Sequence, residues 1–587
     1  MANWFVTTKK ADFNKIAEQF NISPMVARII RNRDITDEKE IEKFLYGTIE
    51  DLCKPEQMKD MEKGIHIISQ KIENGKTIRV IGDYDIDGVC ATHILRKGLR
   101  ICGAIVDTVI PHRVHDGYGL NNHLIQQAHE DGIDTIITCD NGIAAYEQIQ
   151  LAHELGMTVV ITDHHEIPFA ENEQGNRQYK IPLAEAVIDP KQETCEYPYK
   201  EICGAVVAYK FVACLLMKMN KEASILTELL EFAAIATVGD VMPLLNENRI
   251  IVKYGLASMI HTKNIGLKAL LMVNGLANKE LSPYHIGFIV GPCLNATGRL
   301  DSAERALQLF EVDDEAEAAT IAGDLKALND SRKDMTAKGV EEAILQIETT
   351  EMKNDKILVI YLPKCHESLA GIIAGRIREK YGKPTIILTD GEEEVKGSGR
   401  SIEAYHMYEE LTKQKELFIK YGGHKLAAGL SMKKENIEVL RTALNKENSL
   451  TNDDFIEKIQ IDIPMPLRFA TKEFVEELNL LEPYGVGNPK PLFAQKKVHF
   501  ISGRIMGQNK NVGKYVVEDE QQNRFDLIYF GALDKLNQYI TEKFGLEQKL
   551  SLYEGKNTKI ELSVCFYPDI NEYRGNKTLQ IVMKDYQ

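Results

Sequence analysis

The spacing of hydrophobic residues changes along the chain. From Thr77 to Asp189, short β-branched apolar runs alternate with segments whose apolar residues recur at helical spacing. The five apolar runs are TIRVIG (77–82), AIVDTVI (104–110), DTIIT (134–138), MTVVIT (157–162) and EAVI (185–188). Strands that alternate with helices form βαβ units, so this region predicts a parallel sheet.

The remainder of the chain predicts helices, a second α/β region and a barrel. The pattern is helical from Gly204 to about Ile347 and ends in a long charged stretch from Asp314, typical of a helix that bridges two lobes. A second α/β region begins at KILVIYL (356–362), and NKENSLTNDD (445–454) is a candidate linker. After GVGNPKP (485–491), several short strands with turn signals favour a small barrel of the OB type.

We therefore expect an α/β protein with five parts. They are an N-terminal extension (1–70), a parallel-sheet domain (71–311), a long connecting helix (312–350), a smaller α/β domain (351–448) and a linker with an OB-type barrel (449–587).

The composition narrows the classes of function. A net charge of −16 argues against a surface that coats nucleic acid along the whole chain, although a local basic groove remains compatible with it. The ten cysteines form no zinc-binding spacing, which favours a reducing, cytoplasmic setting. The start MANWFVTTKK lacks a secretory pattern, and no apolar run approaches ~20 residues, so we expect a soluble protein without membrane contact.

The first candidate for chemistry is IGDYDIDG (81–88), directly after the first predicted strand. Asp83, Asp85 and Asp87 stand at alternate positions where parallel sheets bind ligands. Carboxylates this close repel each other unless a cation neutralises them. The alternatives are a solvated acidic turn or part of an EF-hand, which would need flanking helices and a glutamate at its twelfth position.

Two more strand ends repeat this pattern, and the end of a helical run adds a fourth candidate. Asp140 precedes an Asn-Gly turn, Asp163-His164-His165 follows another strand, and Asp240 ends an apolar helical run. Each has an ordinary reading by itself: a tight turn, an incidental pair of histidines, a helix C-terminus. Three consecutive strand ends with metal-ligand residue types favour Mn²⁺, or a Mg²⁺/Mn²⁺ pair, over zinc or calcium. Asp163 could accept a hydrogen bond that fixes a histidine tautomer.

Two glycine-rich motifs lie in the second α/β region. GSGRS (397–401) follows a strand, and Gly422-Gly423-His424 predicts a tight turn. Glycines let the backbone approach a phosphate, and serine and arginine supply donors to it. The alternative is an ordinary hairpin.

The four motifs DYDIDG, TCDNGI, TDHHE and ATVGDVMPL together resemble the DHH phosphoesterase superfamily. The segments AVIDPKQETCEYPYKEICGAVVAYK, ENRIIVKYGL, GSGRS, YGGHKLAAGLSM and LEPYGVGNPKP resemble the bacterial RecJ single-strand-specific exonucleases, and the resemblance runs from about Asp83 to Pro491. It implies a DHH lobe and a smaller DHH-associated lobe, joined by a long helix around a cleft and followed by an OB-fold.

The resemblance also implies roles for particular residues. The matching metal ligands are Asp85, Asp87, Asp140, His164 and Asp240. Asp140 would bridge two ions, Asp83 would be a ligand or lie just behind one, and His165 would face the substrate phosphate. The implied chemistry is phosphodiester hydrolysis with two Mn²⁺ or Mg²⁺ ions, in which Asp87, Asp140, His164 and His165 are the catalytic residues.

Further residues match DNA-binding positions of the family. Arg113, Ser398 and Arg400 match residues that hold the 5′ phosphate end, and Gly423-His424 matches a turn with a cleft-facing histidine. Arg299 is a candidate for the nucleotide backbone and Tyr118 for stacking on a base.

The chain also departs from the family pattern in two places. Cys293 stands where related chains commonly carry arginine, and Ser368–Ala370 differs from the usual family wording. Both departures affect the expected binding of the substrate rather than its hydrolysis.

The leading hypothesis is a 5′→3′ exonuclease that degrades single-stranded DNA to 5′ mononucleotides in recombination and repair. A single-strand-binding protein and a helicase are partners that the resemblance implies. One alternative is a phosphodiesterase for short oligonucleotides or cyclic dinucleotides, whose relatives usually lack the C-terminal barrel. Another is a scaffold that binds single strands without cutting, whose relatives lose metal ligands that are present here.

Overall fold

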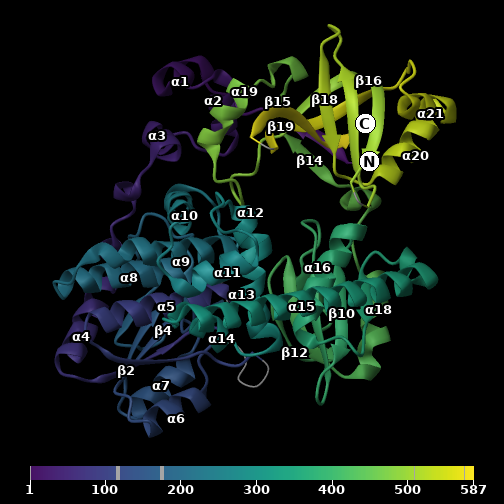
Figure 1. Cartoon of the computed structure of the whole chain (residues 1–587). Coiled ribbons are helices and arrows are strands. Elements are labelled where there is room, and N and C mark those ends of the chain that lie inside the picture. Colours follow the sequence, from purple (N-terminus) through teal and green to yellow (C-terminus); the bar gives the residue numbers. More distant parts are fainter. Residues whose placement is uncertain (1, 114–118, 172–176, 508, 574) are drawn as a thin grey trace. The chain divides into compact units, whose positions relative to one another are not determined.

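The chain folds into two compact units (Figure 1). The computed structural model describes residues 2–113, 119–171, 177–507, 509–573 and 575–587. The large unit consists of Asp51–Pro243 and Glu247–Phe455, and the small unit of Met1–Glu50, Leu244–Asn246 and Ile456–Gln587. Each unit is described by itself.

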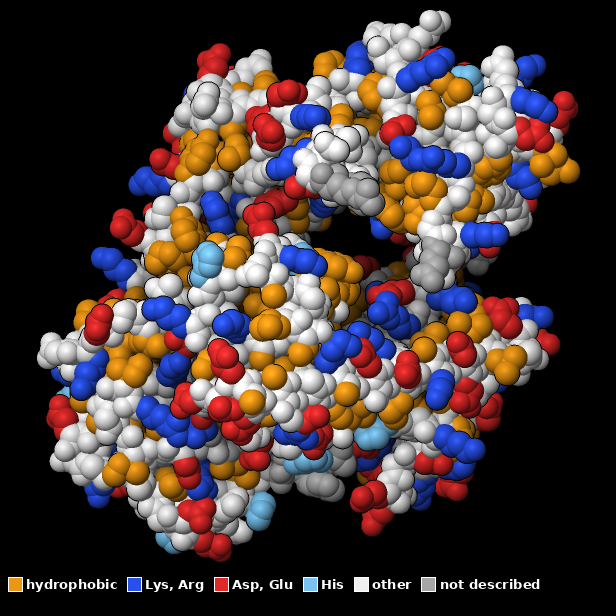
Figure 2. All heavy atoms as spheres, viewed as in Figure 1, with side chains coloured by type: hydrophobic (Ala, Val, Ile, Leu, Met, Phe, Trp, Pro, Cys, Tyr) orange, Lys and Arg blue, Asp and Glu red, His pale blue; other side chains and the backbone are white. Residues whose placement is uncertain are grey.

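Charged side chains lie over much of the surface in view. Figure 2 shows acidic and basic side chains interspersed over that face. Within the described ranges, no helix has the length and apolar character needed to span a bilayer.

The large unit begins with the predicted parallel sheet. Its strand order is β3-β2-β4-β5-β8, and every neighbouring pair is parallel. The strands are β2 (Thr77–Ile81), β3 (Ile105–Val109), β4 (Thr135–Cys139), β5 (Thr158–Thr162) and β8 (Ala186–Ile188). The central strand β4 is buried at every position, which explains its uninterrupted apolar and β-branched sequence.

Helices cover both faces of this sheet. On one face, α6 (Asn122–Glu130) and α7 (Tyr146–Glu154) pack on Ile136 and Ile161. The other face carries α4 (Met61–Glu73), α5 (Ile86–Ile101) and α8 (Gly204–Lys218), and α9 (Leu226–Gly239) packs on α5 and α8. Almost all of α8 is buried, in accord with its lack of a polar face. The result is a doubly wound sheet whose strand carboxyl ends meet at one edge.

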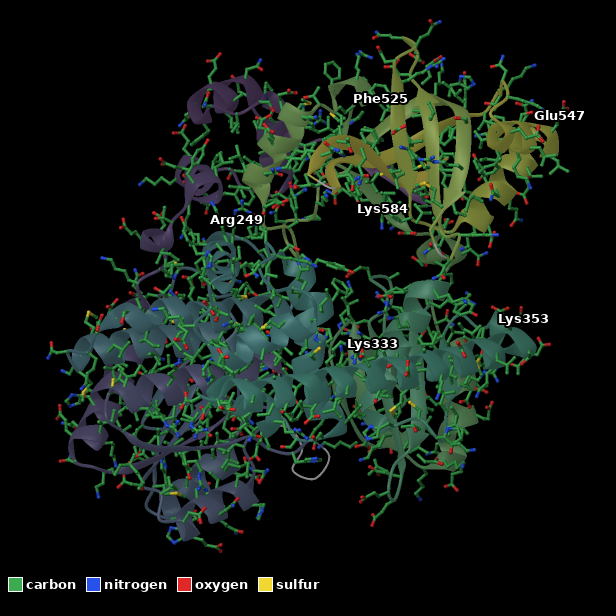
Figure 3. All side chains as sticks on the ribbon, in the orientation of Figure 1. Arg249, Lys333, Lys353, Phe525, Glu547 and Lys584 are labelled. Carbon is green, nitrogen blue, oxygen red and sulfur yellow. The ribbon has the colours of Figure 1, made fainter. Side chains whose placement is uncertain are left out.

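A helical segment then leads to the long helix that the sequence predicts. It contains α10 (Asn246–Met259), α11 (Ile265–Val273), α12 (Pro283–His285), a π-helix (Ile286–Val290), α13 (Gly291–Leu300) and α14 (Glu304–Glu311). The long helix α15 (Glu315–Thr349) starts at the N-cap Asp314, whose carboxylate accepts a hydrogen bond from Glu317 N. Figure 3 labels Lys333 within α15 and Lys353 just beyond its end. At 35 residues α15 is about 52 Å long.

We call the part of the large unit before α15 the first lobe and the part after it the second lobe. The second lobe has a five-stranded mixed sheet in the order β12-β13-β11-β10-β9. Its elements are β9 (Leu358–Tyr361), α16 (Ala370–Tyr381), β10 (Thr385–Asp390), β11 (Val395–Arg400), α17 (Met407–Thr412), β12 (Phe418–Gly423), β13 (Ala427–Met432) and α18 (Ile437–Lys446). The sequence placed GSGRS after a strand, but Gly397–Arg400 belong to β11 itself, because pairing on both sides overrides the low strand propensity of glycine.

The small unit contains the predicted barrel. Strands β16, β17, β18, β20 and β19 pair in that order, and β19 pairs back to β16 and closes the barrel. The strands are β14 (Lys458–Ile461), β15 (Ile463–Pro464), β16 (Phe493–Met506), β17 (Val512–Glu518), β18 (Arg524–Tyr529), β19 (Glu561–Tyr573) and β20 (Asn576–Tyr586). Three of them are longer than the short strands expected. The helices are α19 (Lys472–Leu478), α20 (Leu533–Phe544) and α21 (Leu546–Glu554).

The first 50 residues belong to the small unit. Strand β1 (Asn3–Val6) pairs in parallel with β14, and Phe20, Ile30 and Phe44 join the barrel's apolar core. The three helices of this segment are α1 (Phe13–Phe20), α2 (Pro24–Asn32) and α3 (Glu38–Tyr46). Contacts across more than 400 residues leave no periodic signal in the sequence, so this packing was not foreseen.

A buried ion pair joins the N-terminal segment to the barrel, and it gives a stability prediction. Arg33 Nη1 lies 2.6 Å from Asp462 Oδ1, and both side chains are about 5 % exposed. Asp462→Ala is expected to lower the free energy of unfolding of the small unit by about 3–5 kcal/mol, because it leaves a buried guanidinium without its partner.

Urea titration followed by tryptophan fluorescence measures this effect, since Trp4 on β1 is the single tryptophan. The control is Glu520→Ala, which removes a solvent-exposed partner of Lys497 and should change stability by about 0.5 kcal/mol or less. Equal unfolding midpoints for the two variants would contradict the prediction.

Candidate metal centre and phosphate cavity

Acidic and histidine side chains from four segments meet at the carboxyl edge of the first sheet. Asp83, Asp85 and Asp87 follow β2, Asp140 follows β4, His164 and His165 follow β5, and Asp240 is the C-cap of α9. Their possible ligand atoms form three groups, each within 4.8 Å: Asp140, His164 and His165; Asp87, His164 and Asp240; and Asp83, Asp85 and Asp140. The structure thus brings together all the residues predicted as metal ligands.

His164 lies at the centre of this cluster. Its Nε2 atom is 3.0 Å from Asp140 Oδ1, 3.5 Å from Asp87 Oδ2 and 3.9 Å from Asp240 Oδ2. Ligands around an octahedral ion with bonds of 2.0–2.1 Å lie about 3 Å apart when adjacent and about 4 Å apart when opposite, and the three distances fall in this range. Burial lowers the pKa of His164, so its imidazole is neutral near pH 7 and free to bind a cation.

Backbone amides fix the carboxylates of the first motif. Asp85 is the N-cap of α5 and accepts hydrogen bonds from Asp87 N (2.9 Å) and Gly88 N (3.1 Å). Asp87 accepts hydrogen bonds from Gly204 N (2.6 Å) and Ala205 N (2.8 Å), at the start of α8. These bonds hold the two side chains in place before any ligand arrives.

Close packing at Asp140 also depends on the local backbone. Asp140 has φ of 59°, the left-handed region that aspartate and asparagine adopt more readily than other side chains. A Cβ atom on Gly204 would lie 2.7 Å from the Cβ atom of Asp140, so the start of α8 can approach only as glycine.

Asp163 orients His165 through a hydrogen bond between the two side chains. Its Oδ1 atom lies 2.7 Å from His165 Nδ1, and its Oδ2 atom accepts a hydrogen bond from Ile143 N at 2.9 Å. Burial acts to lower the pKa of His165, but the hydrogen bond and charge of Asp163 raise it to about 9. His165 therefore carries a proton at neutral pH and turns toward the cluster as a cation.

The carboxylates of the cluster repel each other. Burial, and then the charge of Asp85, raise the pKa of Asp83 to about 7. Burial, and then the charge of Asp87, raise the pKa of Asp240 to about 8. Burial and the neighbouring aspartates raise the pKa of Asp140 well above its ordinary value. Both carboxylate oxygens of Asp83 are buried, and the backbone amides of Tyr84 and Gly119 offset only part of the cost of its charge. Divalent cations would reduce the repulsion between the carboxylates and the free-energy cost of burying their charges, so the residues fit a metal centre.

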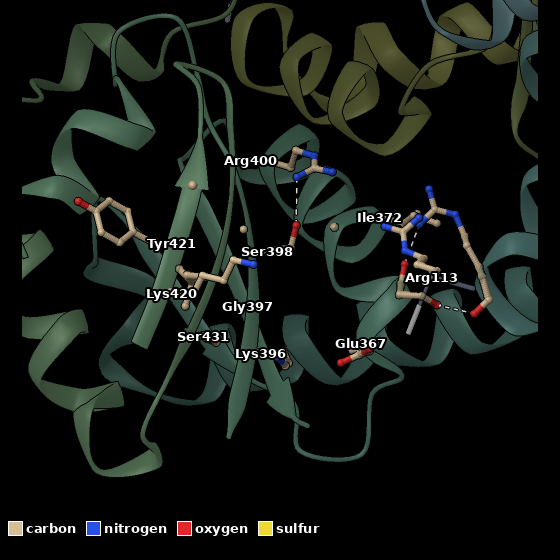
Figure 4. Close-up of a pocket in the computed structure, with 16 residues that line it drawn as sticks. Arg113, Glu367, Ile372, Lys396, Gly397, Ser398, Arg400, Lys420, Tyr421 and Ser431 are labelled. Atoms are coloured by element: carbon tan, nitrogen blue, oxygen red, sulfur yellow. Dashed lines mark hydrogen bonds between the residues drawn. The ribbon is translucent and has the colours of Figure 1, made fainter. Parts of the chain in front are cut away.

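A second polar site lies between the two lobes of the large unit. It is a cavity of about 820 Å³ whose lining includes Arg113 and Arg299 from the first lobe and Ser398 and Arg400 from β11. Figure 4 shows Arg400 bonded to Ser398, with Arg113 across the cavity. Arg400 Nη1 donates to Ser398 Oγ (3.1 Å) and to Gly399 O (2.8 Å).

The cavity is electropositive. Burial, and then the charges of Arg113, Arg332 and Arg400, lower the pKa of Arg299 to about 10. Burial and the charge of Arg113 also lower the pKa of Arg400. Crowded guanidinium groups attract an anion such as a phosphate.

Two residues missed by sequence reasoning complete the sites. A Cβ atom on Gly371 would lie 2.8 Å from Arg400 Nη2, so glycine there leaves room for the arginine. Asp189 directly follows β8, and burial, and then the charge of Asp163, raise its pKa to about 8. Asp189 could have been found, because it follows a strand of the same sheet as the other aspartates.

Other residues that the sequence singled out lie outside the metal centre and the cavity, or outside the described part of the chain. Gly423 and His424 form the exposed turn between β12 and β13, where His424 N donates to Ala427 O, and neither lines the cavity. Tyr118 falls outside the described residues. Cys293, in α13, is buried beside Asn329, whose Nδ2 donates to its Sγ at 3.4 Å.

Comparison with known proteins agrees with this architecture. Residues 77–237 match the N-terminal domain of the DHH family and residues 354–449 match the DHHA1 domain, which defines the large unit as a DHH-family protein. Residues 461–585 match the RecJ OB domain.

Individual relatives identify which group of DHH-family proteins this chain belongs to. The chain is 33 % identical to the single-stranded-DNA-specific exonuclease RecJ of Bacillus subtilis, over 97 % of this chain and 69 % of the relative. It is 30 % identical to RecJ of Escherichia coli, over 96 % and 95 %. The chain belongs to the RecJ family.

Solved structures show the same fold. The crystal structure of RecJ from Thermus thermophilus in complex with Mn²⁺ superimposes with a TM-score of 0.81, at 24 % identity, covering all of this chain and 79 % of that one. A crystal structure of exonuclease RecJ bound to manganese is 30 % identical, with a TM-score of 0.58, over 68 % of this chain and 96 % of that one.

Proposed function

We propose that this protein hydrolyses single-stranded DNA from its 5′ end to 5′ mononucleotides, with two Mn²⁺ or Mg²⁺ ions, in recombination and repair. The observation that carries the proposal is the metal-ligand cluster at the sheet edge of a RecJ-family chain, in the same unit as an arginine-lined cavity. As working partners we propose a single-strand-binding protein and a helicase, and as its location the cytoplasm.

The side chains of the two sites have three different roles in the proposed reaction. Asp83, Asp85, Asp87, Asp140, His164 and Asp240 would hold the cations, which supply charge neutralisation and an activated water when bound. His165, protonated and oriented by Asp163, donates a hydrogen bond to a phosphate oxygen and stabilises negative charge that develops there. The arginines of the cavity bind the terminal phosphate of the strand.

Two alternatives have less support. A phosphodiesterase for short oligonucleotides or cyclic dinucleotides needs no barrel, whereas residues 461–585 match the RecJ OB domain. A scaffold that binds without cutting needs no metal ligands, whereas all the predicted ones converge here.

The test is hydrolysis of a single-stranded DNA oligonucleotide labelled at either end, in Mn²⁺, Mg²⁺ or EDTA, beside a matched duplex and a dinucleotide. We expect metal-dependent release of 5′ mononucleotides from the single strand, starting at the 5′ label. Cleavage of the dinucleotide alone would support the small phosphodiesterase, and binding without cleavage would support the scaffold.

Arg400→Gln is expected to lower kcat/KM for a 5′-phosphorylated strand by about 10- to 100-fold, because a hydrogen bond to a charged group contributes about 1.5–3 kcal/mol. The effect on a strand with a 5′ hydroxyl should be smaller. The control is Arg441→Gln on α18, which removes a charge that pairs with Asp355 in the same lobe. Equal losses on the two strands would contradict a phosphate-binding role for Arg400.

A further inference from the structure

A reciprocal pair of hydrogen bonds joins the two lobes beside the phosphate cavity. Arg299 Nη1, on α13 of the first lobe, donates to the backbone oxygen of Ser368 at 2.7 Å. Ser368 Oγ, in the turn before α16 of the second lobe, donates to the backbone oxygen of Arg299 at 3.0 Å. Ser368 is 6 % exposed, so water competes little for these bonds.

We propose that Ser368 is a positioning residue that sets the spacing between the metal centre and the phosphate cavity through Arg299. The inference rests on the proposed function, and it assigns to a residue of the cavity lining a role that it performs through Arg299. The serine hydroxyl lies in Ser368–Ala370, where the chain departs from the usual family wording.

On the first-lobe side, α13 is tied to the metal motif. Asn295 Oδ1 accepts a hydrogen bond from Ile86 N at 2.9 Å, between Asp85 and Asp87. A Cβ atom on Gly298 would lie 2.3 Å from the backbone oxygen of Tyr84, so the two backbones are in close contact. A displacement of Arg299 therefore acts on the segment that carries three of the proposed metal ligands.

On the second-lobe side, the turn with Ser368 leads directly into the cavity wall. Gly371 follows three residues later, and a Cβ atom there would lie 2.9 Å from Ser398 Oγ and 2.8 Å from Arg400 Nη2. The same turn thus contacts both Arg299 and the residues proposed to hold the terminal phosphate.

His366 adds a third member to the contact. Its Nδ1 atom lies 2.7 Å from Ser368 Oγ. The same Nδ1 atom accepts a hydrogen bond from Ser368 N at 3.3 Å, so the imidazole of His366 caps the turn that holds Ser368.

The distance between the metal centre and the phosphate cavity matters for the reaction. An enzyme that releases one nucleotide at a time must hold the terminal phosphate and the scissile phosphate one nucleotide apart. Misplacement by about 1 Å can cost about 100-fold in rate. The contact through Ser368 joins the elements that carry the two sites by direct hydrogen bonds.

Ser368→Ala tests the proposal, because it removes the hydroxyl and keeps the backbone oxygen that Arg299 binds. Ser69→Ala is the matched control: Ser69 Oγ donates to His66 O at 3.0 Å within α4, is also buried, and bridges no lobes. We expect Ser368→Ala to raise KM for 5′-phosphorylated single-stranded DNA about three- to tenfold, the range for one neutral hydrogen bond. Hydrolysis of bis(p-nitrophenyl) phosphate, which does not span the two sites, should change less than about twofold.

Equal changes in KM for the two serine variants, or equal losses on both substrates, would overturn the positioning role. Thermal unfolding of both variants separates a loss of fold from a loss of position.

Hydrogen exchange of the wild type and both variants tests the contact without catalysis. Amides of residues 298–301 should exchange faster in Ser368→Ala alone, and unchanged exchange would overturn the proposal. A wild-type protein that fails to cut single-stranded DNA would contradict the proposed function, and the exchange experiment would still decide whether the lobes are joined here.

Discussion

Asp140→Asn is expected to lower kcat on single-stranded DNA by about 10⁴-fold or more while the chain stays folded. Asp140 contributes to two of the three ligand groups, lies 3.0 Å from His164 and has two carboxylate oxygens, so it can bridge two cations. Loss of one member of a catalytic set that acts as a unit commonly costs this much. Asparagine suits the positive φ of this position, and it removes a charge whose burial is unfavourable in the metal-free protein.

The same strand offers a matched control. Asp134 precedes β4 as Asp140 follows it, and it forms ion pairs with Lys71 and Lys76 at the opposite edge of the sheet. Asp134→Asn should therefore change kcat less than about twofold. Steady-state rates with saturating Mn²⁺, together with thermal unfolding, measure both variants. Turnover of Asp140→Asn within tenfold of wild type would remove the bridging role.

Removal of metal is expected to have the second largest effect. EDTA should lower turnover by at least about 10³-fold, because the activated water and most of the charge stabilisation come from the cations. Mn²⁺ or Mg²⁺ should restore activity. Persistent cleavage after exhaustive chelation would contradict a metal centre.

Metal affinity should also depend on pH. Asp83, with a pKa of about 7, and Asp240, with a pKa of about 8, hold protons at pH 6 that a cation must displace. We expect the apparent affinity for Mn²⁺ to rise about tenfold or more between pH 6 and pH 7, measured by calorimetry in buffers of matched ionic strength. An affinity independent of pH would contradict these shifts.

The same pKa shifts predict the sign of the stability change. In the unfolded chain these carboxyls titrate near pH 4, so between about pH 4 and pH 8 the folded, metal-free protein binds protons that the unfolded chain has lost. Its stability should therefore fall as the pH rises through this window. Mn²⁺ should raise the melting temperature more at pH 8 than at pH 6.

Local sequence patterns were sufficient to predict the first sheet. All five apolar runs form the strands of that sheet, because a buried parallel strand needs an apolar side chain at nearly every position. Helix α15 was predictable from the long charged stretch that begins at Asp314. The pairing of β1 with β14 was not, since it depends on residues more than 450 positions apart.

Some residues of the metal centre could likewise be predicted from local sequence patterns, and others could not. Asp83 to Asp87, Asp140 and His164 follow strands of one sheet, so their convergence at its edge follows from topology. Asp240 ends a helix, and its place beside His164 depends on how α9 packs, which only the family resemblance indicated. Ser368 had no such signal, because its hydrogen bonds to Arg299 form between two lobes that fold from separate segments.

The most direct test of the central claim is an anomalous difference map from crystals soaked in Mn²⁺, recorded at the manganese absorption edge. The account predicts two peaks about 3.5–4 Å apart, with Asp140 between them and His164 and Asp240 among the ligands. A single peak, or peaks away from these residues, would contradict a two-metal centre at the edge of the first sheet.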